Sequence, residues 1–116
     1  MREEDLVGNA MNIILHAGEA RTTVMKALDA LSLADEVSAK SLLETAQKQI
    51  TKAHQVHTDT IQKEAAGESI PYSPLFSHAQ DTLMTIYSEL NIAKQLLRIF
   101  SALDQRVKQL EQKTGA

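Results

Sequence analysis

Polar side chains able to take part in chemistry gather in the stretch Ser77-His78-Ala79-Gln80-Asp81-Thr82. A neutral imidazole is a competent nucleophile near pH 7, so His78 can carry a phosphoryl group transiently. Residues three and four apart share one side of a helix, which would place His78, Asp81, Thr82 and Thr85 in one polar strip. Ser77, Gln80 and Thr82 are hydrogen-bond donors able to stabilise a group on that imidazole. A capped helix start with a solvated polar face explains the same spacing without any chemistry.

Apolar residues at three- and four-residue steps predict three helices that would position this strip. The first runs from about Glu4 to Leu31, and the second from about Val37 to Ala65, with Gly67 as its left-handed stop. The third begins at Ser73-Pro74, a cap and first-turn pair, and its apolar seam continues to Leu110. Three helices of this length with short joints predict an all-α fold, an antiparallel up-down-up three-helix bundle.

The third predicted helix has more apolar residues than the interior of one bundle can bury. Besides its seam, it has a second apolar surface: Phe76, Met84, Tyr87, Ile92, Leu96 and Ile99. This surface predicts a homo-oligomer built around the third helix. Gly18 lies inside the first predicted helix, where glycine costs about 1 kcal/mol relative to alanine, so we expect a close contact with another helix there.

Composition narrows the class of protein. The 116 residues are expected to form one domain, and a hydrophobic content of 43% argues against disorder. The chain has no cysteine, which excludes disulfides, thiolate metal sites and a cysteine nucleophile. Its net charge is −3 and no basic run is present, so nucleic acid is not an expected partner. No apolar run approaches the roughly 20 residues of a membrane span and no signal-peptide pattern is present, so we expect a cytoplasmic protein without membrane insertion.

Three separate motifs resemble those of one protein family. The run Ile70-Pro71-Tyr72-Ser73, followed by His78-Ala79-Gln80-Asp81 and then Leu83-Met84, resembles the active-site signature of the lactose/cellobiose-type enzyme IIA. That family belongs to the bacterial phosphoenolpyruvate-dependent sugar phosphotransferase system. The segment Ala17-Gly18-Glu19-Ala20-Arg21 is similar to the family's first-helix motif, and Glu64-Ala65-Ala66-Gly67-Glu68 is similar to the end of its second helix.

The resemblance covers about residues 5–105 and implies a phosphocarrier that assembles as a homotrimer. It implies that His78 accepts a phosphoryl group from the phosphocarrier protein HPr and passes it to a cysteine of enzyme IIB, during uptake of a lactose- or cellobiose-type disaccharide. It also implies that Asp81 lies at the threefold axis, where three copies share one divalent cation, Mg²⁺. Gln80 matches the motif position beside the histidine, where its amide can hydrogen-bond a phosphoryl oxygen.

The chain departs from the family pattern in two places. The family commonly has a second histidine directly after the aspartate, where this chain has Thr82, which can still donate one hydrogen bond. Residues 106–116 extend past the family's usual end, and we expect them to form a frayed helical tail.

Two other functions remain open at the level of the sequence. A non-catalytic helical oligomerisation module would share the same apolar periodicity, but it would tolerate replacement of His78. A metal-storage bundle would use His54 and His57, which lie one turn apart. No spacing supplies a third and fourth ligand, so we expect half-buried structural histidines instead.

Overall fold

The computed structural model describes residues 1–115, which form three α-helices and no strand. Helix α1 spans Glu3–Ser32, α2 spans Glu36–Ala65 and α3 spans Pro74–Lys113. The prediction of an all-helical chain with three helices is confirmed. The observed helix bounds differ by no more than a few residues from those expected from the sequence.

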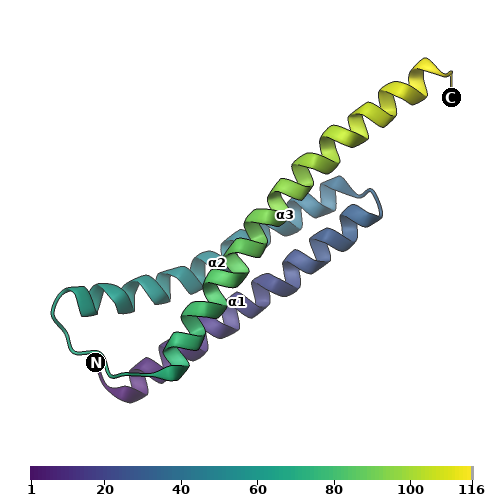
Figure 1. Ribbon diagram of the computed structural model, residues 1–116. Helices are drawn as coiled ribbons and strands as arrows, with labels where there is room; N and C mark the ends of the chain where they lie inside the picture. Colours follow the sequence, from purple (N-terminus) through teal and green to yellow (C-terminus); the bar gives the residue numbers. More distant parts are fainter. Residues whose placement is uncertain (116) are drawn as a thin grey trace.

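Successive helices run in opposite directions along the chain (Figure 1). Between α1 and α2, the Asn9 amide donates to the Thr60 hydroxyl and the Thr23 hydroxyl donates to the Gln49 side chain. Residues early in α1 therefore lie beside residues late in α2. Helix α3 crosses both helices and extends beyond the turn between them, which gives the molecule an extent of 69 Å along its longest axis.

The core is made of aliphatic and alanine side chains from all three helices, as the periodicity predicted. The largest fully buried apolar side chains are Leu6, Ile13, Ile50, Leu83, Ile86 and Leu90. On α3 the buried seam ends at Ala93, and its continuation is exposed at Leu103, Val107 and Leu110. Within one chain only the first half of the predicted seam is therefore buried, because α3 extends beyond the two helices that cover it (Figure 1).

The joints between helices follow local backbone chemistry. Residues 33–35 connect α1 to α2, with Ala34 in the left-handed region at φ 58°. The Asp35 carboxylate caps α2 by accepting the Ser38 backbone N–H at 3.1 Å. The Ser38 side chain, and after it this backbone N–H, lower the pKa of the Asp35 carboxyl group. Gly67 ends α2 at φ 96°, as predicted. The contact expected at Gly18 is wrong, because a Cβ added there would meet nothing within 4 Å.

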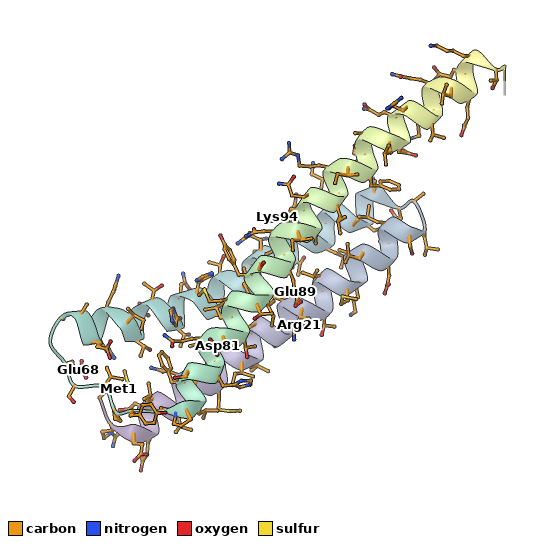
Figure 2. The ribbon with its side chains drawn as sticks, viewed as in Figure 1. Met1, Arg21, Glu68, Asp81, Glu89 and Lys94 are labelled. Atoms are coloured by element: carbon orange, nitrogen blue, oxygen red, sulfur yellow. The ribbon has the colours of Figure 1, made fainter. Side chains whose placement is uncertain are left out.

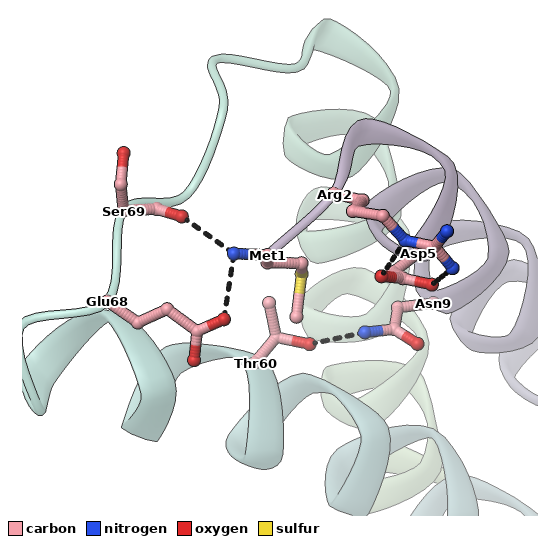
Figure 3. A network of polar contacts seen from close by, with 7 residues as sticks. All are labelled: Met1, Arg2, Asp5, Asn9, Thr60, Glu68 and Ser69. Atoms are coloured by element: carbon pink, nitrogen blue, oxygen red, sulfur yellow. Dashed lines mark hydrogen bonds and ion pairs between the residues drawn. The ribbon is translucent and has the colours of Figure 1, made fainter.

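Contacts at one end of the bundle hold the segment that leads into α3 (Figure 3). The Met1 amino group donates to the Ser69 carbonyl at 3.2 Å and lies 2.7 Å from the Glu68 carboxylate. Thr60, a residue that is 1% exposed, links α2 to α1 through its hydroxyl, which accepts from the Asn9 side chain. These contacts tie the α2–α3 connection to the start of α1 and so restrain the approach to the first turn of α3.

The segment after about residue 105 continues helix α3. Helix α3 continues without interruption to Lys113, with exposed side chains from residue 105 onward. Asp104 and Lys108 form an ion pair of 3.0 Å one turn apart. Residue 116 of the predicted tail lies outside the described residues.

Candidate functional site

The first two turns of α3 position the candidate residues. The Ser73 hydroxyl caps the helix by accepting the Phe76 N–H at 3.1 Å, and Pro74 occupies the first turn, as the sequence predicted. On this helix His78 and Asp81 are exposed and Thr82 is half-buried. Asp81 stands on the surface of α3 in Figure 2. The polar strip predicted from the spacing is therefore present.

The His78 imidazole is exposed and makes no side-chain hydrogen bond to any of residues 1–115. Its ring nitrogens are accessible to a docked protein, as a nucleophile must be. Among residues 1–115, the one side-chain hydrogen bond at this residue goes to its backbone, since the Thr82 hydroxyl donates to the His78 carbonyl at 2.8 Å. Thr82 has one O–H, so the donor predicted to assist the imidazole is held by the backbone in this state.

Gln80 points away from the polar strip. Residues two apart on an α-helix differ by about 160° in direction, so Gln80 and His78 lie on opposite sides of α3. The structure shows this directly, because Gln80 Nε2 lies 2.9 Å from His57 Nε2 on α2. The structure thus separates the predicted donors: Thr82 accompanies His78, Gln80 faces α2, and the exposed Ser77 lies between these two directions.

A hollow of about 370 Å³ lies beside Gln80, between the end of α2, the α2–α3 connection and the start of α3. Its polar lining consists of Thr60, Glu64, Tyr72, Ser73, Ser77 and Gln80. His78 does not line it. The sequence contained no signal for this hollow, because its wall joins residues that are separated by up to twenty positions in the chain.

His54 and His57 on α2 are half-buried, as predicted, and the structure shows that both rings contact aromatic side chains of α3. His57 stacks on Phe76, with ring centroids 5.9 Å apart and planes inclined by 14°. Burial lowers the pKa of His57, and positive charge on His54 would lower it further. His54 meets the edge of Tyr87 at 4.9 Å.

Metal-binding capacity within one chain is low. In the described part of the chain no group of three or more histidine, cysteine, aspartate or glutamate side chains could hold a metal ion. The metal-storage alternative therefore gains no support. Asp81 supplies one exposed carboxylate, a hard oxygen donor of the kind that Mg²⁺ prefers, but a cation needs several such ligands. The residues fit Mg²⁺ only where further copies of Asp81 converge.

Membrane insertion also finds no support among the described helices, none of which combines the length and the apolar character needed to cross a bilayer.

Comparison with known proteins assigns the family. The family model described as "PTS system, Lactose/Cellobiose specific IIA subunit" matches residues 8–101. The chain is 36% identical over 111 residues to the PTS system lactose-specific EIIA component of Lacticaseibacillus casei, covering 96% of this chain and 94% of the relative. It is 34% identical to the oligo-beta-mannoside-specific EIIA component of Bacillus subtilis (strain 168), covering 78% of this chain and 83% of that protein.

Solved structures agree with this assignment. The crystal structure of PtcA from S. mutans superposes with a TM-score of 0.85 at 36% identity, covering 87% of this chain and 99% of that one. A IIA(Chitobiose) chain, solved in complex with HPr, superposes with a TM-score of 0.76 at 25% identity, covering 90% of this chain and 99% of that one. The chain therefore belongs to the lactose/cellobiose-specific enzyme IIA family of the phosphotransferase system.

Proposed function

We propose that this enzyme IIA chain is a phosphohistidine carrier in the cytoplasm. His78 accepts a phosphoryl group from HPr and passes it to the cysteine of enzyme IIB during uptake of a lactose- or cellobiose-type disaccharide. The observation that carries the proposal is the exposed His78 imidazole, without a side-chain hydrogen bond within residues 1–115, at the start of α3. The solved complex of IIA(Chitobiose) with HPr supports HPr as the donor.

Each transfer is a substitution at phosphorus. The lone pair of the unprotonated His78 nitrogen forms a P–N bond while the bond from phosphorus to its carrier group on HPr breaks, and that electron pair stays with HPr. In the second transfer the cysteine thiolate of enzyme IIB attacks phosphorus, and the P–N bond electrons return to the His78 ring. Positioning and hydrogen bonds to the phosphoryl oxygens supply the catalysis.

The exposed apolar face of α3 supports a homotrimer of antiparallel up-down-up bundles. Relative to Asp81, both Ile92 and Ile99 lie within about 20° around the helix, and these two side chains are 57% and 54% exposed. Packing this face about a threefold axis would bury it and bring three copies of Asp81 together. Three converging carboxylates repel one another, and one shared Mg²⁺ ion would offset that repulsion.

A threefold arrangement also explains why Gln80 points away from its own His78. From Asp81, His78 lies about 60° to one side of α3, whereas Ser77 and Gln80 lie about 40° and 100° to the other side. In a ring, each side of one protomer faces the opposite side of the next. We therefore place His78 of one chain beside Ser77 and Gln80 of its neighbour, where these donors stabilise the phosphoryl group. Thr82 of the same chain can join them once its hydroxyl leaves the His78 carbonyl.

A relay assay tests the proposed function. Phosphorylated HPr and enzyme IIB are mixed with the wild type, with His78→Ala or with the control His54→Ala, and phosphate on the cysteine of IIB is measured by mass. We expect transfer with the wild type and the control and none with His78→Ala. Equal transfer with all three proteins would reject the proposal and favour a non-catalytic helical oligomerisation module, the alternative with which the exposed face of α3 is also compatible.

The shared site has its own test. Neither His78→Ala nor Gln80→Ala trimers should transfer at the wild-type rate, because each lacks one side of every site. Mixed trimers of the two variants contain sites with both side chains intact, so mixing should restore part of the rate. A rate equal to the average of the two separate variants would show that each chain uses its own Gln80.

A further inference from the structure

The contact between His57 and Gln80 joins α2 to the candidate site. We propose that His57 is a positioning residue for phosphoryl transfer, whose unprotonated Nε2 accepts one N–H of Gln80 and fixes the amide with its second N–H available to the phosphoryl group. The inference rests on the proposed function and adds a residue to it. The polar contact of His57 is with Gln80 and not with His78, so His57 acts through Gln80 and not on the phosphoryl group.

The chemistry of the two atoms determines which one donates. An amide nitrogen has two N–H bonds and does not accept, so at 2.9 Å from Gln80 Nε2 the His57 Nε2 must accept. The His57 ring proton then lies on Nδ1. Partial burial of His57 lowers its pKa, which favours this neutral ring at physiological pH.

The ring is held in place from its face as well as from its edge. Phe76 stacks almost parallel to His57 and is only 8% exposed. The backbone N–H of Phe76 is itself held by the Ser73 cap. The acceptor on α2 and the amide on α3 are therefore both attached to well-packed elements, and the amide is restrained before any partner docks.

Restraint matters because a glutamine side chain has two chemically different ends. Its terminal torsion is roughly two-fold, so an unrestrained amide presents either its oxygen or its NH₂ group to a neighbouring ligand. A phosphoryl group carries only acceptor oxygens and a charge of about −2, so an oxygen turned toward it would repel it. His57 removes that orientation, because its Nε2 accepts only from the NH₂ end.

A kinetic series separates positioning from a structural role. The rate of phosphorylation is measured against HPr concentration for the wild type, His57→Leu, His57→Gln, Gln80→Met and the double variant His57→Leu/Gln80→Met. His54→Leu is the matched control, because it removes a half-buried imidazole one turn away that does not contact Gln80.

We expect His57→Leu to lower the maximal rate about tenfold without changing the half-saturating HPr concentration. This pattern is expected when the hydrogen bond from Gln80 to the phosphoryl group contributes only in the transition state. His57→Gln offers a carbonyl acceptor and should remain within about threefold of the wild type, and His54→Leu within about twofold. The double variant should be no slower than Gln80→Met alone, because the two residues act as a unit. A wild-type maximal rate for His57→Leu, an equal loss in His57→Gln, or additive losses in the double variant would overturn the proposal.

A second measurement does not depend on transfer. Nitrogen-15 spectra of the unphosphorylated protein should show His57 with an unprotonated Nε2 and a protonated Nδ1 at neutral pH, and a protonated Nε2 would overturn the proposal. Phosphorylation that survives in His78→Ala would instead reject the proposed function, whatever the state of His57. The two failures are thus distinguishable.

Discussion

Removing the Ser73 cap should weaken the helix that carries the site. In Ser73→Ala the Phe76 N–H loses the hydroxyl that accepts it at 3.1 Å. Loss of an N-cap side chain costs about 1 kcal/mol in the free energy of unfolding, and this corresponds to roughly a fivefold change in the ratio of folded to unfolded chains. Ser73→Asp keeps an acceptor at the positive end of the helix and should retain the wild-type stability.

The assay is urea unfolding followed by far-UV circular dichroism, with all proteins at one protomer concentration because self-association contributes to stability. Ser69→Ala is the matched control: it removes an exposed serine hydroxyl from the same connection, and Ser69 uses only its carbonyl to hold Met1. The control should change the unfolding free energy by less than about 0.5 kcal/mol. Equal stabilities for Ser73→Ala and Ser69→Ala, or a failure of Ser73→Asp to retain stability, would refute the assigned cap.

Three further predictions concern the site. Asp81→Leu should abolish binding of the shared cation, measured as metal per trimer. Light scattering should show a trimer that is intact or tighter, because apolar packing replaces a buried charge. Stoichiometric cation in the variant would contradict the role of Asp81. Thr82→His should change the transfer rate little if threonine already serves, and a large gain would show that this departure from the family pattern limits the rate. The lowered pKa of His57 should make the free energy of unfolding fall as pH drops from 7.5 to 5, because the unfolded chain binds the proton more tightly than the folded one. His57→Gln should show a smaller drop in its urea midpoint over this range. An identical drop would contradict the lowered pKa of His57.

The helices were predictable because their determinants are local. Apolar steps along the chain identify the buried stripes, and the stop at Gly67 and the start at Ser73-Pro74 depend only on neighbouring residues. The sequence also placed His78 and Asp81 correctly on one strip of α3, since helical geometry alone relates residues three positions apart.

The features that were missed depend on distance in the chain. Periodicity predicted one continuous seam on α3, but burial ends at Ala93 because α1 and α2 do not extend far enough to cover the rest. The bond between His57 and Gln80 joins residues 23 positions apart, and no local pattern marks it. Arg21 has a similar long-range partner in Glu89, 2.8 Å away across α1 and α3 (Figure 2).

At Gly18 the sequence predicted a contact that the structure does not contain. Its cost inside a helix suggested a close contact, yet its surroundings are open within one chain.

The most direct test of the central claim is the intact mass of the chain after incubation with phosphoenolpyruvate, enzyme I and HPr, recorded at neutral pH. We predict one added phosphoryl group per wild-type chain, its loss on brief acid treatment because the P–N bond is acid-labile, and no addition to a folded His78→Ala variant. An unmodified wild-type chain, or a phosphoryl group that persists in His78→Ala, would contradict it.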